Sequence, residues 1–294
     1  MHKVVIAYFF LSLVTTLGLA QSDETGSYVI VESENSTSFM QGFPPPADKI
    51  IRRFRVGATE DEYRWSLQNM SQINFVDPVS RGSEPVLPLP YGDGHLLDKH
   101  FSKSGGQSAP LRELLSEMKV DGFIVLQDGV ILTEAYYNGL TPDTRHIVFS
   151  VTKSMVGTLM GTLIDDSLVD RARIAADYLP ELKGTAIGSA TIQQILDMTA
   201  SVEWNHDRSD PSSEVNVNSV AGDFIPRPPD FAFANTLEFV QSLKPNIDHG
   251  VNYVYSSANT ETLGWVIHGS CNRTGRKSSL SASGRSSVLN TTHL

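Results

Sequence analysis

Apolar and polar positions follow the clearest pattern between residues 123 and 164. Two β-prone runs at 123–126 and 130–137 flank Asp128-Gly129, a strong signal for a hairpin with a tight turn. About ten residues later, a helical apolar pattern begins at Val151. A strand pair, a short link and an apolar helix predict an α+β fold in which a helix packs on an antiparallel sheet.

The helix expected over 151–164 has apolar residues on most of its surface, which predicts burial nearly all round. Gly157 and Gly161 are poor helix formers, so their presence predicts close packing against another element. Lys153 is the only charged residue between Arg145 and Asp165. A lone lysine in such a segment points to a chemical role.

Weaker patterns predict the other elements. Short helices are expected over 111–118 and 237–243, and Thr191-x-x-Gln194 has the form of a capping box that opens a helix through Met198. A further helix follows Tyr255. The remaining stretches of 47–118 and 201–235 are rich in turn residues and are expected to be irregular.

The chain divides into four expected segments. Residues 1–20 have a basic start, an apolar run and small residues before Gln21, as in a secretory signal peptide. Residues 21–46 form a polar leader, and residues 47–269 form the folded domain. We therefore expect a secreted or periplasmic protein with no stable membrane span once the signal is cleaved.

Residues 270–294 differ from the rest of the chain. After Cys271 they contain no aromatic and no acidic residue and many serines, so they cannot bury enough surface to fold. A disordered tail and a break in the coding sequence both explain this. The break is favoured because the change follows an apolar helix that expects a partner. The protein would then be truncated.

Composition narrows the function classes. With 40% hydrophobic and 19% charged residues, the 294-residue chain has the composition of a soluble globular protein. Its net charge of −10 argues against nucleic acid as a partner. The single cysteine, Cys271, excludes an intrachain disulfide.

The candidate chemistry begins at Ser150-Val151-Thr152-Lys153. Residues three apart share a helix face, so the Ser150 hydroxyl and the Lys153 amine can point into one small volume. A serine needs a neighbouring base to become a nucleophile, and burial can make lysine such a base. The helix N-terminus adds N–H donors for a developing oxyanion. The plain alternative is an N-cap serine beside a solvated lysine.

A second candidate motif is Tyr255-Ser256-Ser257. A tyrosine near a lysine can lose its proton more readily and then accept one, so Tyr255 is a candidate base. Ser257 is expected to hydrogen-bond Lys153 or the substrate. The plain alternative is a strand-end tyrosine followed by an N-cap serine.

Together these motifs resemble the serine β-lactamase and penicillin-binding-protein superfamily, in its class C-like branch that includes 6-aminohexanoate-dimer hydrolases and related esterases. The likeness covers about residues 47–269. It is carried by FSVTKSMVGTLMG at 149–161, YLPE at 178–181, ATIQQILDMT at 190–199, DPSSEV at 210–215 and YSSANTETLGW at 255–265.

The resemblance implies an exported hydrolase that cleaves a small amide or ester through an acyl-enzyme at Ser150. Lys153 and Tyr255 would transfer the proton, and the Ser150 N–H would contribute to the oxyanion hole. No metal and no organic cofactor are implied. Ser257 stands where β-lactamases have asparagine, which makes β-lactamase activity less expected. Asp210 and Arg208 lie in the loop that seats the substrate in the oligomer-hydrolase branch, with Arg208 at the place of that branch's tyrosine.

One departure concerns the family's third motif, which lies on a strand beyond the tyrosine motif and has no counterpart after Tyr255. The hairpin at 123–137 is then expected to have an unpaired edge, and activity to be impaired. The alternative function is a penicillin-recognising or peptide-binding module without turnover. A Ser-His-Asp hydrolase is not supported, because no Gly-x-Ser-x-Gly occurs. The sequence assigns no oligomeric state.

Overall fold

The computed structural model describes residues 4–6, 20–22, 28–31, 38–52, 54, 58–74, 76–79, 85–92 and 95–273. The chain forms two compact units, where the sequence predicted one folded domain. The first comprises Met1–Ile50 and Arg81–Arg145, and the second comprises Ile51–Ser80 and His146–Leu294. Each unit contains its own cluster of buried apolar side chains.

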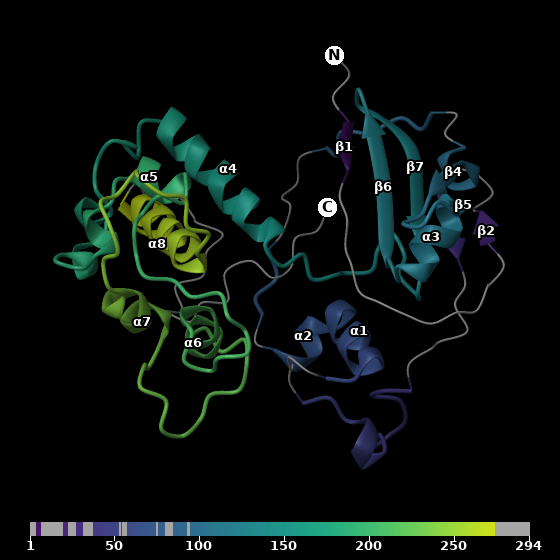
Figure 1. Cartoon of the computed structure of the whole chain (residues 1–294), viewed down its shortest axis with the longest axis horizontal. Helices are drawn as coiled ribbons and strands as arrows, with labels where there is room; N and C mark the ends of the chain where they lie inside the picture. The colour runs from purple at the N-terminus through teal and green to yellow at the C-terminus, as the bar shows by residue number, and fades with distance from the viewer. Residues whose placement is uncertain are drawn as a thin grey trace. The chain divides into compact units, whose positions relative to one another are not determined.

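The first unit is built around a five-stranded sheet in the order β1-β6-β7-β3-β2 (Figure 1). The hairpin formed by β6 (Gly122–Gln127) and β7 (Val130–Tyr136) confirms the sequence prediction, with Phe123 opposite Ala135. Both turn residues, Asp128 and Gly129, have positive φ, as a type I′ turn requires. Burial alternates along both strands, which is the pattern of a sheet with one covered face.

The edges of this sheet correct two predictions. The hairpin has no unpaired edge, because β1 (Val4–Ile6) pairs with β6 and β3 (Val29–Val31) pairs with β7. The pairing of β3 with β7 is parallel, so the sheet is mixed and not antiparallel throughout. Exposed N–H and C=O groups at a strand edge favour pairing with any β-prone segment in reach.

Segments predicted to lie outside the fold supply those partners. β1 comes from the expected signal peptide, while β3 and β2 (Ala20–Ser22) come largely from the expected leader. The rest of residues 1–19, including most of the apolar run that suggested export, lies outside the described residues, as do 23–27 and 32–37. Signal cleavage is therefore not tested.

A short helix covers the sheet of the first unit. Leu115 of α3 (Leu111–Glu117) packs with Phe123, Val125 and Ala135 from the covered face. This helix matches the one predicted at 111–118. Figure 1 shows α3 near β6 and β7, with the small ribbon of β4 (His100–Ser102) and β5 (Ser108–Pro110) beside it.

The second unit is mainly helical. Its helices are α1 (Glu60–Gln68), α2 (Met70–Ile73), α4 (Val151–Asp165), α5 (Ile192–Leu196), α6 (Glu214–Ala221), α7 (Thr236–Ser242) and α8 (Ser257–Arg273). Short 3-10 turns at Ala175–Asp177 (η3), Pro180–Leu182 (η4) and Ile187–Ser189 (η5) connect α4 to α5, and the first unit has two more at Ala47–Lys49 (η1) and Leu96–Asp98 (η2).

The predicted helices and the missed ones have local explanations. The capping box at Thr191 is confirmed, with reciprocal hydrogen bonds between Thr191 and Gln194. The helices α1, α2 and α6 lie in stretches predicted to be irregular. At α1 the Thr59 side chain accepts from the Glu62 N–H, and three acidic residues stabilise the first turn.

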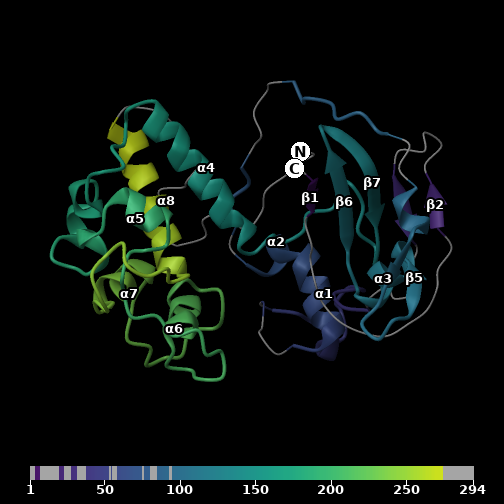
Figure 2. The same cartoon turned by 45° about the horizontal axis from the view of Figure 1, so that its top comes forward.

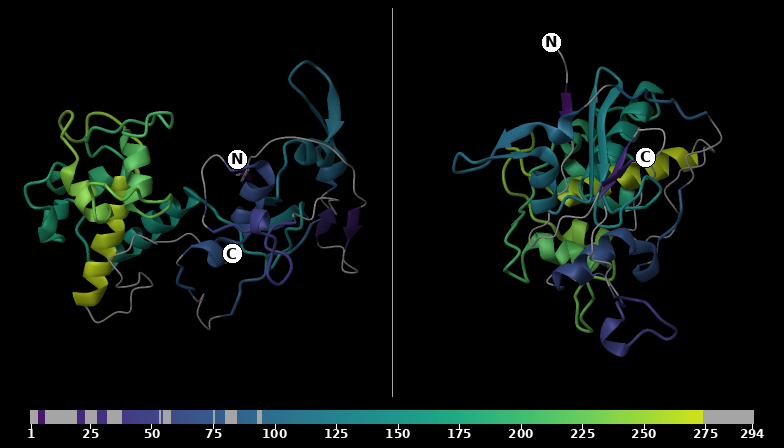
Figure 3. Two further views of the ribbon diagram at one scale, coloured as in Figure 1. Left: turned by 90° about the horizontal axis from the view of Figure 1, so that it is seen from below. Right: turned by 90° about the vertical axis from the view of Figure 1, so that its right-hand side faces the viewer.

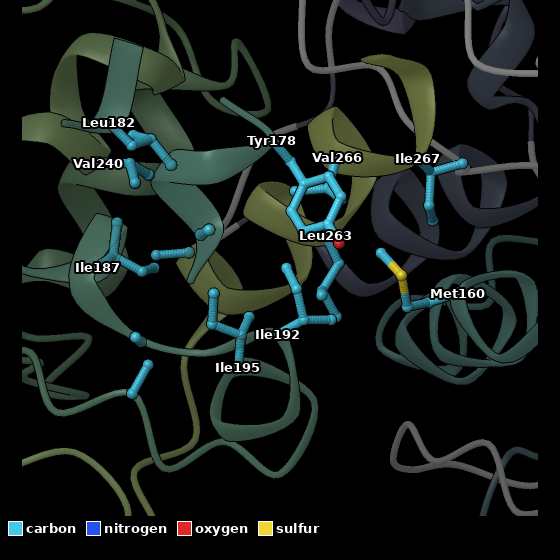
Figure 4. Packing of buried hydrophobic residues seen from close by; sticks show 14 of the residues in the cluster. Met160, Tyr178, Leu182, Ile187, Ile192, Ile195, Val240, Leu263, Val266 and Ile267 are labelled. Atoms are coloured by element: carbon cyan, nitrogen blue, oxygen red, sulfur yellow. The ribbon is translucent and has the colours of Figure 1, made fainter. Parts of the chain in front are cut away.

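Helix α4 packs against α8, and α5 packs against α8 as well. Figures 2 and 3 show α4 and α8 side by side from several directions. In Figure 4, Met160 points from α4 toward side chains of α8 such as Leu263 and Ile267. Since α4 carries Ser150 and Lys153 at its start and Tyr255 directly precedes α8, this packing sets the spacing of the candidate residues.

The burial predicted all round α4 is wrong for this chain. One stripe is buried, formed by Thr152, Val156, Met160 and Leu163, while Val151 is 44% exposed. A Cβ added at Gly157 or Gly161 would meet no atom within 4 Å. Among the described residues, nothing packs closely on the helix face that carries the two glycines, where the sequence had predicted close packing.

The end of the described chain lies within α8. The tail was predicted to begin at 270, but α8 continues to Arg273, and Ser270 and Cys271 are buried. Residues 274–294, which make up most of the predicted tail, lie outside the described residues. Of the helices in the described segments, none combines the length and the apolarity needed to cross a bilayer.

Candidate active site

Ser150 occupies the N-cap position of α4, but its hydroxyl does not cap the helix. Lys153 Nζ instead donates a hydrogen bond to Ser150 Oγ at 3.1 Å. The sequence predicted this contact, because residues three apart lie on one face of a helix. The hydroxyl of an ordinary N-cap serine would accept a backbone N–H of the first turn. Its pairing with the lysine leaves it placed for proton transfer to a base.

The residue before Ser150 has a strained backbone. Phe149 has φ of +42°, in the left-handed region that bulky side chains rarely enter. Its ring packs edge-on against Phe54 and Phe224, with centroids 6.4 Å away in both pairs. Phe54 is buried, and its ring centroid lies 4.7 Å from that of Phe224. Aromatic packing thus holds the sharp turn that presents Ser150, a feature with no local sequence signal.

The backbone around Ser150 can bind a negative oxygen. Among the described residues, the Ser150 N–H donates no hydrogen bond. It lies at the positive end of a 15-residue helix. A free backbone donor at this place is suited to a developing oxyanion on a carbonyl attacked by Ser150 Oγ.

Tyr255 lies against Lys153. The Lys153 ammonium is 5.1 Å from the centroid of the Tyr255 ring, within the range of a cation–π contact. Tyr255 is 37% exposed, so part of this residue is open to solvent. The chain then turns directly into α8, where buried Ser256 accepts the Ala258 N–H at 3.2 Å. Ser256 therefore acts as the capping serine, and Tyr255 stands just outside the helix.

Ser257 is the first residue of α8 and is half-buried. Within the described part of the chain, it makes no side-chain hydrogen bond to Lys153. The structure thus brings Ser150, Lys153 and Tyr255 together, and places Ser257 two residues from Tyr255 without a direct link to the lysine.

Arg208 and Asp210 lie in a loop that is held by its own side chains. The Asp210 carboxylate accepts from the Ser212 N–H at 2.8 Å and its hydroxyl at 2.7 Å. Asn216 Nδ2 donates to the Asp210 carbonyl at 2.7 Å. The exposed Arg208 guanidinium donates to Ser219 Oγ at 3.4 Å, with no contact to Ser150 or Lys153 given by the structure. The predicted substrate-seating role of these two residues is not tested.

The same loop contributes His206, to which the sequence assigned no role. The His206 ring stacks on the Tyr255 ring, with centroids 6.1 Å apart and an angle of 27°. Its neighbours fix it: the Asn205 N–H donates to Glu214 Oε2 at 2.8 Å, and the Asp207 N–H donates to Asn205 Oδ1 at 2.9 Å. No motif signals this contact, because it joins residues 49 positions apart in the sequence.

Electrostatics in this loop favour a charged carboxylate. Hydrogen bonds from the Ser209 hydroxyl and N–H hold the pKa of Asp207 below its ordinary value. No group of three or more His, Cys, Asp or Glu residues that could hold a metal ion occurs among the residues described.

Comparison with known proteins places the chain in a family. The family model described as Beta-lactamase matches residues 88–277. The 6-aminohexanoate-dimer hydrolase of Paenarthrobacter ureafaciens is 38% identical over 209 residues, which make up 69% of this chain and 50% of that protein. The chain thus spans half the length of this curated relative.

A solved structure agrees with the sequence match. The structure of "Putative 6-aminohexanoate-dimer hydrolase from Bacillus anthracis" superposes with a TM-score of 0.70 and 26% identity. The alignment covers 82% of this chain and 61% of that one. The fold is therefore β-lactamase-like, as the resemblance implied, and the chain belongs to the beta-lactamase family.

Proposed function

We propose that this chain carries the nucleophile-bearing part of an exported serine hydrolase that cleaves small amide or ester substrates through an acyl-enzyme at Ser150. The observation that carries the proposal is the 3.1 Å contact between Lys153 Nζ and a Ser150 hydroxyl that caps no helix. Membership of the beta-lactamase family supports the same chemistry. Export rests on the pattern of residues 1–20 alone.

In the proposed reaction, the reactive form of the Lys153–Tyr255 pair carries one proton fewer than an ammonium and a phenol together. The Ser150 hydroxyl transfers its proton to that basic site as Oγ attacks the substrate carbonyl carbon. The carbonyl oxygen becomes an oxyanion that accepts the free Ser150 N–H. Collapse of this adduct breaks the amide or ester bond, and the stored proton goes to the leaving amine or alcohol. Water then hydrolyses the acyl-enzyme by the reverse proton path.

The substrate class follows from the relative and from the open site. The curated relative is named for the dimer of 6-aminohexanoate, which contains one linear amide. Tyr255 is 37% exposed and Ser150 is exposed, so the two groups can reach an extended substrate. We propose short linear amides and esters, with Arg208 marking a difference in how an amide is seated.

The test compares two serines on one helix. Ser150→Ala is expected to lower p-nitrophenyl acetate hydrolysis at least about a hundredfold and to abolish labelling by a fluorescent phosphonate. Ser154→Ala, an exposed serine one turn further along α4, should leave both unchanged. Equal hydrolysis by wild type and Ser150→Ala would refute the proposal. Labelling of Ser150 without turnover would instead support the acyl-binding alternative.

A further inference from the structure

The segment that leads into Tyr255 is docked on another segment by its backbone. Residues 244–254 run alongside residues 198–203 and exchange hydrogen bonds with them. The donor–acceptor pairs are Glu203 N to Lys244 O, Asn246 N to Ser201 O, Ile247 N to Ser201 Oγ, Gly250 N to Thr199 O, and Val254 N to Met198 O. The last bond, at 2.8 Å, fixes the residue directly before Tyr255.

His249 adds two side-chain bonds to this docking. The Ser201 N–H donates to His249 Nδ1 at 2.9 Å, and His249 Nε2 lies 2.9 Å from Ser189 Oγ. Ser201 is fully buried and Ser189 closes η5, so the imidazole joins three parts of the second unit.

The partners determine the protonation state of the ring. A backbone N–H can only donate, so Nδ1 must carry no proton in this arrangement. Ser189 Oγ gives its own proton to the Ala186 carbonyl at 2.8 Å, so it accepts from Nε2. The bonds are therefore satisfied together by the neutral imidazole with its proton on Nε2.

We propose that His249 is a positioning residue for Tyr255. It holds 244–254 on 198–203 only in its neutral form, and this inference rests on the proposed function of Tyr255. Loss of the imidazole would leave the buried Ser201 N–H without its acceptor and free the loop at its centre. Tyr255 would then lose its fixed place beside Lys153, which lowers turnover more than substrate binding.

Protonation has the same effect as removal. A second proton, on Nδ1, would make this nitrogen a donor. It would then face the Ser201 N–H, which is also a donor, and the hydrogen bond between them would be lost. Besides His249, the ionisable residues along the docked segments are Glu203, Lys244, Asp248 and Tyr253, all exposed, and η5 contains none. The described residues show no ion pair between these groups and His249. Turnover should therefore fall at acid pH, where an imidazole ordinarily gains its second proton.

Three variants separate the two bonds. His249→Asn places an amide oxygen near the position of Nδ1, so it keeps the Ser201 bond and does not titrate. Ser189→Ala removes the other bond alone. His249→Ala removes both. We expect kcat for p-nitrophenyl acetate to fall about ten- to a hundredfold in His249→Ala with KM changed little, and His249→Asn to stay within about threefold of wild type.

The pH profile and hydrogen exchange provide the decisive readouts. Wild type should lose kcat as the pH is lowered into the acid range, whereas His249→Asn should lack this loss. Amides of 246–254 should exchange faster in His249→Ala, and near the wild-type rate in His249→Asn. Nitrogen-detected NMR of the wild type at neutral pH should show the proton on Nε2.

Two results would overturn the proposal: a proton on Nδ1 at neutral pH, or equal exchange and equal kcat in wild type and His249→Ala. If His249→Ala does not fold, the pH profiles of wild type and His249→Asn decide, and identical acid limbs count against the proposal. If the wild type hydrolyses no ester, the proposed function fails, while exchange and NMR still test the role of His249.

Discussion

Phe149 shows how a single strained residue can support a reactive one. Its φ of +42° costs energy in any L-residue with a side chain, and contacts with Phe54 and Phe224 offset that cost. We expect Phe149→Ala to lower the free energy of unfolding by about 1–3 kcal/mol, because the ring is lost and the strain stays. Phe149→Gly loses the same ring but relieves the strain.

The glycine variant should therefore be the more stable of the two, by about 1 kcal/mol. This order reverses the one seen at ordinary helix positions, where alanine is favoured. Urea denaturation of both variants measures it. An alanine variant as stable as the glycine variant would show that the turn carries no strain.

Tyr137 in the first unit gives a pH-dependent prediction. It is buried, and its hydroxyl has no hydrogen-bond partner among the described residues. Burial raises the pKa of Tyr137 to about 12, although Arg112 opposes the shift. The pKa of Tyr137 in the folded state lies above the unfolded value of 10.0, so the unfolded state loses this proton first as the pH rises. The folded protein therefore keeps its full stability below pH 10 and loses part of it as the pH rises toward 12.

Tyr137→Phe should remove this alkaline loss, which amounts to about 2–3 kcal/mol at its limit. At pH 7 the variant should be at least as stable as wild type, since no bond is broken and an unpaired hydroxyl is removed. Thermal unfolding at pH 7 and pH 11 measures both effects. The matched control is Tyr253→Phe, at an exposed tyrosine, which should leave the pH dependence unchanged.

At the residue scale, the sequence predicted the contacts between residues that are close together along the chain. Ser150 and Lys153 are three residues apart on one helix, so their contact follows from helix geometry. The contacts of His206 with Tyr255 and of His249 with Ser201 join residues 49 and 48 positions apart. Only tertiary packing creates them, and a single sequence contains no periodic signal for such pairs.

At the scale of elements, the packing of α4 on α8 determines how the candidate residues meet. Met160 of α4 is fully buried against this contact. Met160→Ala should lower the free energy of unfolding by about 2–5 kcal/mol, because a cavity replaces the side chain. It should also lower kcat, since α4 and α8 hold Lys153 and Tyr255 in place.

Met160→Leu provides the control for this substitution. It keeps the volume nearly constant and should cost less than about 1.5 kcal/mol, with kcat close to that of wild type. Calorimetry and ester hydrolysis measure both quantities. If Met160→Ala lowered stability and left kcat unchanged, the spacing of the two helices would not control the site.

Elements with the strongest local signals were predicted, while some weaker helices and the strands defined by long-range pairing were not. The hairpin has its Asp128-Gly129 turn and α5 has its capping box, and both are present. Strands β1 and β3 are three residues long and exist because β6 and β7 offer them edges. Such strands have too few positions for an alternating pattern to show.

At the scale of the whole molecule, the face of α4 that carries Gly157 and Gly161 differs from expectation. Gly157 and Gly161 predicted a closely packed neighbour, but the structure leaves space at both positions. Neither glycine has positive φ, so neither is required by the backbone conformation. A glycine in a helix without such a requirement destabilises it relative to alanine.

Gly161→Ala is therefore expected to raise the free energy of unfolding of this chain by about 0.5–1 kcal/mol. Whether Gly161→Ala raises or lowers the free energy of unfolding distinguishes an uncovered face of α4 from a covered one. If another segment or a second copy covered it closely, the added methyl would clash and the variant would lose stability.

Gly188→Ala is the matched contrast. The new Cβ would lie 2.0 Å from the Leu182 carbonyl oxygen, so this substitution must destabilise the second unit. Urea denaturation of both variants at two protein concentrations measures the signs and tests for a second copy. A stabilised Gly161→Ala beside a destabilised Gly188→Ala would show that the α4 face is open in the chain as it stands.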